Sequence, residues 1–203
     1  MSKSVLQIFD THVLPSDRVC LIKYGQEKYA KKVFSLVVKE NNQTQLRNQL
    51  VQIQEDFKES NLPISMEPDS KLFAKSIKTA LAEFKNNANN KKWIIAFSTE
   101  VPCISDQSGV NYNLQAAMKL GKSNVNMLFV LFQVGNKIHE TANFAQFQEV
   151  MVMHQSKELQ RQCGSTECLM LIEPHERHLD AQMDQIENLR LEYDHPMIYE
   201  TFK

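Results

Sequence analysis

The chain has 203 residues, of which 42% are hydrophobic, so it is long enough to bury one sizeable core. Its net charge of -1 offers no basic excess for binding nucleic acid or an anionic membrane. No apolar run approaches the roughly 20 residues that span a bilayer. We therefore expect neither nucleic acid nor a membrane as a partner.

The four cysteines, Cys20, Cys103, Cys163 and Cys168, lack the Cys-x-x-Cys spacing of structural zinc and are too sparse for a disulfide scaffold. Reduced thiols are therefore predicted. The amino terminus reaches Asp10 after too few apolar residues for the core of a signal peptide. Together these features predict a cytoplasmic or nuclear protein.

The first half of the chain predicts one helix, two strands and two further helices. Apolar residues at helical spacing predict a helix over residues 4–13, and RVCLIKY (18–24) and KVFSLVV (32–38) predict strands whose short connection favours an antiparallel, hairpin-like pair. Thr44 is the expected cap of the next helix, which carries an apolar stripe from Leu46 to Phe57. A second stripe runs from Leu72 to Phe84.

Strands and helices alternate through the second half. Residues 93–97 are apolar throughout, which predicts a central strand covered on both faces, and 125–134 predict another. Helices are expected at 113–120, at about 144–153 and from Leu179 onward, with a last strand at 168–172. The stretch Gly121-Lys122-Ser123 is expected to be the carboxyl-terminal cap of the first of these helices. The alternation predicts one α/β domain with a largely parallel sheet over residues 1–192, followed by a tail at 193–203.

Four segments occur in the order and spacing of a von Willebrand factor type A (vWA) domain, and from about Val5 to Leu189 the chain resembles that family. They are SDRVCLIKYG, LFAKSIKTALAEF, KKWIIAFSTEV and NVNMLFVLFQVG. The resemblance implies a doubly wound, mostly parallel sheet with helices on both faces and a ligand site at the carboxyl ends of the strands. In the family that site holds a divalent cation, commonly magnesium.

The chain departs from the family at the metal motif. The family's Asp-x-Ser-x-Ser and the central strand before it have no counterpart, and Val101 stands where the family has glycine. A central strand leaves two unpaired edges when it is missing. Three explanations are open: the flanking strands pair directly, another chain donates a strand, or the sequence is a fragment of a longer protein.

The resemblance places candidate metal ligands at Ser70, Thr99 and Glu100, which could bind magnesium weakly once the missing segment is present. The surrounding residues form a candidate partner-binding face: Asp69, Ser98, Pro102, Ser105 and Asp106. The alternative is that Ser98, Thr99 and Glu100 are only the polar end of a buried strand. No catalytic residue and no firm cofactor is predicted.

Two other motifs have simpler explanations. His175 and His178 could share a helix face for zinc, but no further ligands accompany them, and a solvated first turn is favoured. Cys163 and Cys168 flank Gly164 and Ser165, which are expected to form the turn before the last strand, with Cys168 its first buried residue.

Intracellular vWA domains commonly serve as scaffold subunits, so the resemblance implies a non-enzymatic protein interaction module, within a larger intracellular protein or complex. Two alternatives are open. One is a metal-dependent, adhesion-type ligand-binding domain that uses Ser70, Thr99 and Glu100. The other is a small hydrolase or transferase with Glu100 as acid or base, because doubly wound folds host many chemistries.

Overall fold

A computed structural model describes residues 2–23, 31–59, 70–84, 91–104, 111–132, 134–174 and 178–184. The predictions for Asp69, Ser105, Asp106, His175 and the tail at 193–203 lie outside these residues. The chain divides into two compact units, which are described separately. Unit 1 comprises Met1–Arg18, Val38–Asn61 and Pro174–Lys203, and unit 2 comprises Val19–Val37 and Leu62–Glu173.

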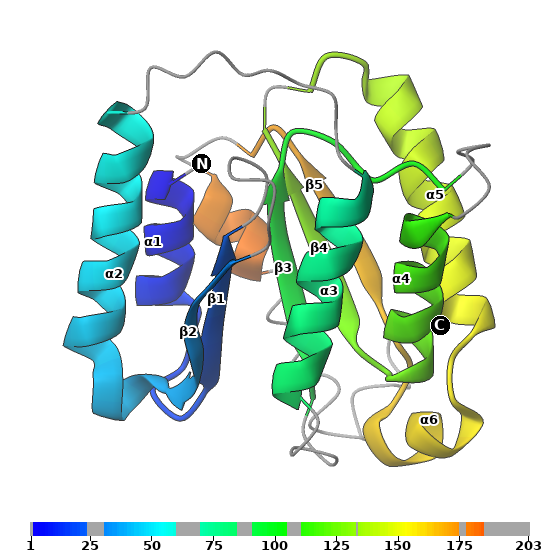
Figure 1. The fold of residues 1–203 in the computed structure, drawn as a ribbon, viewed down its shortest axis with the longest axis horizontal. Helices are drawn as coiled ribbons and strands as arrows, with labels where there is room; N and C mark the ends of the chain where they lie inside the picture. The colour runs from blue at the N-terminus through cyan, green and yellow to red at the C-terminus, as the bar shows by residue number, and fades with distance from the viewer. Residues whose placement is uncertain are drawn as a thin grey trace. The chain divides into compact units, whose positions relative to one another are not determined.

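Unit 2 is built on a parallel sheet of strands β3 (Trp93–Ser98), β4 (Asn126–Leu131) and β5 (Cys168–Ile172), in the order β3-β4-β5 (Figure 1). The predicted α/β class with a parallel sheet is confirmed. All residues of β4 are buried, as its apolar run predicts. The prediction that 93–97 is the central strand is wrong for the described residues, where β3 lies at the end of the sheet. An apolar run indicates that a strand is buried. Its position in the sheet depends on which distant segments pair with it, and the run does not show this.

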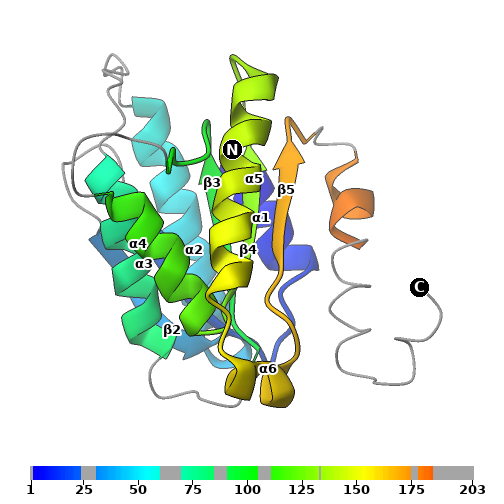
Figure 2. The same ribbon diagram turned by 90° about the vertical axis from the view of Figure 1, so that its right-hand side faces the viewer.

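Three helices cover one face of this sheet: α3 (Ser70–Phe84), α4 (Tyr112–Lys122) and α5 (Lys137–Met153) (Figure 2). Alternate strand residues face them, because side chains along a strand point to opposite faces. Phe129 of β4 lies 6.1 Å from Phe73 of α3 and 5.3 Å from Phe147 of α5, measured between ring centroids. These rings form the centre of the unit 2 core.

The cap of α4 lies within the predicted stretch Gly121-Lys122-Ser123, whereas Gly121 itself lies inside the helix. A Cβ at this position would lie 2.2 Å from the carbonyl oxygen of Met151 in α5. The cap is Ser123, and Asn124 takes the left-handed conformation with φ 50. Glycine is therefore required because the backbones of two helices approach closely, which only residue pairs distant in sequence can reveal.

Helix α5 begins earlier than predicted, and a further short helix was not predicted. Asn136 caps α5 by accepting a hydrogen bond from the backbone N–H of His139, so the helix starts at Lys137 rather than near Phe144. Helix α6 (Lys157–Cys163) begins after the cap Ser156 and has no buried residue, so it lacks the apolar stripe by which helices are recognised. Gly164 ends it with φ 79, and Cys168 is the first, buried residue of β5, as predicted.

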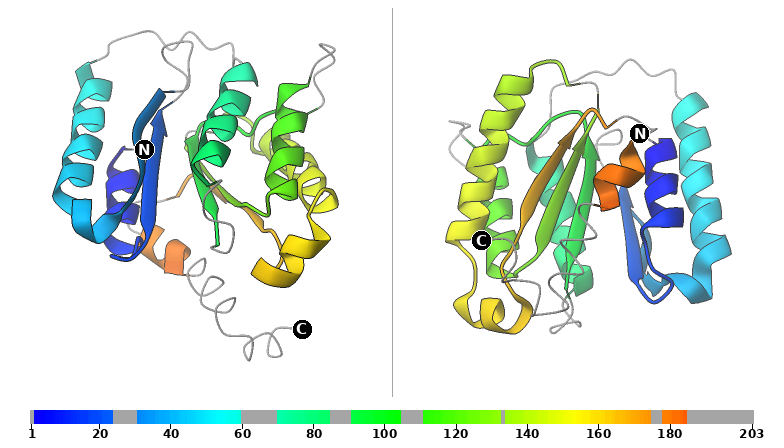
Figure 3. Two further views of the ribbon diagram at one scale, coloured as in Figure 1. Left: turned by 60° about the horizontal axis from the view of Figure 1, so that its bottom comes forward. Right: turned by 180° about the vertical axis from the view of Figure 1, so that it is seen from behind.

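Strands β1 (Arg18–Lys23) and β2 (Lys31–Val38) pair in a separate two-stranded sheet, which confirms their predicted pairing. Glu83 near the end of α3 holds β2 through both carboxylate oxygens. Its Oε1 accepts a hydrogen bond from Lys32 Nζ at 2.7 Å, and its Oε2 accepts one from the N–H of Leu36 at 3.0 Å. The two-stranded sheet stands on the β3 side of the three-stranded sheet, whereas β5 is on the far side (Figures 1 and 3).

Unit 1 contains helix α1 (Ser2–Thr11), helix α2 (Lys39–Glu59) and a helical stretch at 179–184. Helix α2 starts directly after β2, before the predicted cap Thr44. Its first N–H groups are satisfied by the turn between α1 and β1, because Lys39 donates to the carbonyl of Asp17 and Glu40 to that of Pro15. Buried apolar residues from all three segments form its interior: Ile8, Phe9, Leu46, Leu50, Leu179 and Met183.

No helix among the described residues combines the length and apolar character needed to cross a membrane.

Candidate functional site

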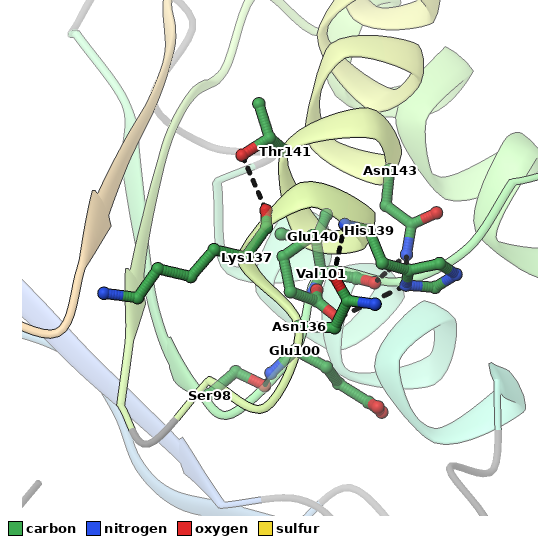
Figure 4. A network of polar contacts seen from close by, with 9 residues as sticks. All are labelled: Ser98, Glu100, Val101, Asn136, Lys137, His139, Glu140, Thr141 and Asn143. Atoms are coloured by element: carbon green, nitrogen blue, oxygen red, sulfur yellow. Dashed lines mark hydrogen bonds and ion pairs between the residues drawn. The ribbon is translucent and has the colours of Figure 1, made fainter.

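The carboxyl ends of the unit 2 strands meet the amino end of α5, and polar side chains gather there (Figure 4). Parallel α/β sheets usually bind ligands at this edge. We call it the carboxyl edge and define it as Ser98–Val101 together with Asn136–Asn143. It contains three of the residues predicted from the sequence, Ser98, Thr99 and Glu100.

Two side chains of α5 hold the loop that follows β3. The N–H of Val101 donates to Glu140 Oε2 at 2.5 Å, and the carbonyl of Val101 accepts from Asn143 Nδ2 at 3.4 Å. Val101, Glu140 and Asn143 are all buried. Both backbone groups of a buried loop residue are thereby paired, which avoids the cost of about 1–3 kcal/mol for a buried unpaired group.

Glu100 is the predicted site residue whose electrostatics the fold changes most. Burial, and then the negative charge of Glu140, raise the pKa of the Glu100 carboxyl above its ordinary value of 4.5, and His139 acts in the opposite direction. Its N–H donates to Ser98 Oγ at 3.3 Å, and Figure 4 shows its side chain pointing away from α5. Glu100 is half-buried and lies in the negative field of Glu140, so a positive group at this position would favour its charged form.

His139 lies between two partners that favour different forms of its ring. Its Nδ1 is 3.3 Å from Asn143 Nδ2, which requires an unprotonated Nδ1, and 3.6 Å from Glu140 Oε1, which favours a protonated one. The imidazole is mostly exposed. It therefore lies at the surface of the edge rather than in a closed catalytic pocket.

The other predicted residues are less closely connected. Thr99 is exposed, Pro102 is half-buried, and Ser70 is the first residue of α3. Among the described residues, no group of three or more His, Cys, Asp or Glu side chains could hold a metal ion.

Sequence reasoning missed Glu140 and Asn143, which lie 39 and 42 positions beyond Val101. One signal could have found them. Together with Phe147 and Met151 they follow a helical spacing, so two polar residues occupy the buried face of α5 near its amino end. Buried polar side chains need partners, and the loop at the strand ends provides them.

The fold makes two of the four cysteines, Cys20 and Cys168, unreactive. Burial raises the pKa of the Cys168 thiol to about 12, and burial together with the charge of Glu83 raises that of Cys20 to about 11. Thiolates are the reactive form of cysteine, so both groups are unreactive at neutral pH. None of the four cysteines, all of which the structure describes, forms a disulfide bond.

No protein-family model matches this chain, and no curated protein matches its sequence.

Proposed function

We propose that the chain is a non-enzymatic protein interaction module with a vWA-like, doubly wound fold, acting within a larger intracellular protein or complex. The carboxyl edge is its contact surface. The observation that carries the proposal is the use of Glu140, whose buried carboxylate accepts a backbone N–H instead of facing a substrate. Glu140 makes the edge rigid, and the groups left at the surface are suited to contact rather than to chemistry.

An exposed apolar side chain supports the same conclusion. Ile138, in the first turn of α5, is 84% exposed and lies beside His139 and Glu140 of the carboxyl edge. Protein interfaces commonly combine an apolar anchor with a polar rim. Ile138 is suited to be the anchor, and Glu100 and Thr99 are suited to the rim. The matching partner segment offers an apolar pocket next to a lysine or arginine.

Selection from a displayed peptide library that contains basic and apolar residues tests this proposal. Ile138→Ser is expected to weaken the selected binders by about tenfold, the effect of losing about 1.4 kcal/mol at an anchor. Met153→Ser is the matched control, because Met153 is 73% exposed at the opposite end of the same helix. Equal losses for the two variants, or no loss for Ile138→Ser, would contradict the proposal.

A magnesium titration distinguishes this proposal from metal-dependent ligand binding. Binding to the folded state alone raises the thermal midpoint. We expect no rise, because the oxygens of Glu140 already face the Val101 N–H and His139. A magnesium-dependent rise that Glu100→Ala abolishes would instead support the metal-dependent alternative.

A further inference from the structure

The outer edge of β3 directs backbone hydrogen-bonding groups away from the sheet. The carbonyl of Lys92 accepts from Asn126 N at 2.8 Å, and that of Ser98 accepts from Phe132 N at 2.9 Å. Backbone groups alternate in direction along a strand, and β3 pairs with β4 in parallel register. The groups of Ile94 and Ala96 therefore face β4. Those of Trp93, Ile95 and Phe97 face the opposite side, where the described residues include no hydrogen-bonded strand.

This edge lacks the features by which proteins protect exposed strands. Natural edges carry charged residues, proline or bulges, whereas β3 reads Trp-Ile-Ile-Ala-Phe-Ser. On one face of β3, Ala96 is buried in the core and Ile94 packs against it. On the other face Ile95 and Phe97 are half-buried. A neighbouring strand would extend both apolar surfaces.

The strand at the opposite end of the sheet, β5, has part of its outer edge hydrogen-bonded to a helix side chain. The same alternation directs the carbonyl of Cys168 away from β4, since Met127 N donates to the adjacent carbonyl of Glu167. Gln148 Nε2 of α5 donates to this Cys168 carbonyl at 3.0 Å. A helix side chain thus occupies part of the β5 edge, and no described side chain does the same for β3.

The surroundings of β3 limit what can reach its edge. The β1–β2 sheet stands on this side, held to α3 by the two hydrogen bonds of Glu83 (Figures 1 and 3). A second copy of the chain would bring a whole sheet and its helices to this position. A single extended segment is the slender form that can lie beside β3 and pair with its backbone.

We propose that the outer edge of β3 binds an extended segment of a partner protein as an added β-strand. The segment has about six successive apolar residues and no proline, because its two faces continue the two apolar faces of β3. Backbone groups of Trp93, Ile95 and Phe97 supply the hydrogen bonds. This inference goes beyond the proposed function, and it uses the strand edge rather than Ile138 and the carboxyl edge.

Amide hydrogen exchange in the whole chain provides the first test. The N–H groups of Ile94 and Ala96 are expected to exchange slowly, and those of Trp93, Ile95 and Phe97 quickly. The probe is a set of twelve-residue peptides whose six central positions are Val, Ile, Leu, Phe, Tyr or Thr. A bound peptide is expected to slow exchange at Trp93, Ile95 and Phe97 at least about tenfold. Slow exchange at these groups without peptide would overturn the proposal.

Two proline variants test the geometry. Ile95→Pro removes an outward N–H, which edge strands tolerate, and its ring obstructs the added strand, so peptide affinity is expected to fall at least about tenfold. Ala96→Pro removes an N–H that faces β4 and is expected to disrupt the sheet. Unchanged peptide affinity in a folded Ile95→Pro protein would overturn the proposal.

An ester in place of the Ile95 amide, introduced by semisynthesis, covers the case in which Ile95→Pro does not fold. It deletes the same N–H and keeps the side chain, and it is expected to weaken peptide binding, whereas unchanged affinity would contradict strand addition. Ile138→Ser is expected to leave peptide binding at β3 unchanged. If Ile138→Ser abolished binding of these peptides, the peptides would be bound at the carboxyl edge instead, and the proposal would also be overturned.

Discussion

The two units bury different kinds of group at their centres. In unit 2 the centre is a cluster of aromatic rings from the buried strand β4 and the helices α3 and α5, and the two helices α4 and α5 approach closely at Gly121. In unit 1 a charged side chain is buried: Lys39 is 4% exposed, and its Nζ donates to the carbonyls of Phe9 at 2.5 Å and Val13 at 2.6 Å. The stability of the unit 2 centre is therefore expected to depend on close packing, and that of the unit 1 centre on the hydrogen bonds of a buried charge.

The contacts of Lys39 explain how an ammonium group is stable there. The two carbonyls lie near the carboxyl end of α1, where the helix dipole favours a positive charge. The Nζ also lies 4.7 Å from the centre of the Phe9 ring, which is a cation–π distance. Lys39 is the first residue of α2, so it joins the start of one helix to the end of another.

The largest effect is expected from Gly121→Ala, which tests the role of shape in unit 2. The new Cβ would overlap the Met151 carbonyl, so the helices must separate, at a cost of about 3 kcal/mol. Urea denaturation measures this loss. Gly135→Ala is the matched control, because no atom lies within 4 Å of its Cβ position, and a change within about 0.5 kcal/mol is expected. Equal effects would show that helix contact at Gly121 is unimportant.

Lys39→Met tests the role of polar pairing in unit 1. It keeps most of the side-chain volume but leaves the carbonyls of Phe9 and Val13 without their donor, which is expected to cost about 2 kcal/mol. Amide exchange in α1 measures the loss locally. Lys3→Met is the control, because Lys3 is exposed on the same helix. If the amide hydrogens of α1 exchange at the same rates in the two variants, the buried ammonium of Lys39 does not stabilise unit 1.

Glu140→Ala tests whether unit 2 also needs a polar pair at its edge. The buried N–H of Val101 loses its acceptor, and about 1.5 kcal/mol of stability is expected to be lost. Glu140→Gln retains an acceptor oxygen and is expected to cost less. Because it removes the charge of Glu140, it should also lower the pKa of Glu100, which an NMR titration measures. An unchanged Glu100 pKa would contradict the assigned cause.

The smallest effect concerns pH. The pKa of Glu100 in the folded state is raised above 4.5, its ordinary value and the value expected in the unfolded chain. At a pH between the unfolded-state and folded-state pKa, the folded state therefore binds a proton that the unfolded chain has lost. This residue therefore makes the free energy of unfolding decrease as pH rises through that window. Glu100→Gln is expected to remove this part of the slope and slightly increase stability at neutral pH. If the free energy of unfolding decreased more steeply with pH in the variant, the pKa of Glu100 would be lowered by folding rather than raised.

Much of the fold could be predicted from the sequence because burial follows local patterns. Residues 168–172 were predicted as a strand at the observed bounds, and the helix at Leu72 to Phe84 was placed within two residues of its start. The start of α5 was missed because the residues of its first turn are exposed except for Glu140, which is polar, so this turn carries no apolar stripe. Of the candidate site, Ser98, Thr99 and Glu100 were predicted at the carboxyl edge, but the α5 residues that hold Val101 there were not.

The strands and the helices with an apolar stripe could be recognised from the sequence, as could their alternation, because hydrophobic periodicity is a local property. The fold alone places β3 at the end of its sheet, lets α4 and α5 approach closely at Gly121, and pairs Glu140 and Lys39 with backbone groups. Each of these depends on residues far apart along the chain being brought together. Their partners cannot be recognised from spacing alone, because a buried polar group and a strand edge accept many different neighbours.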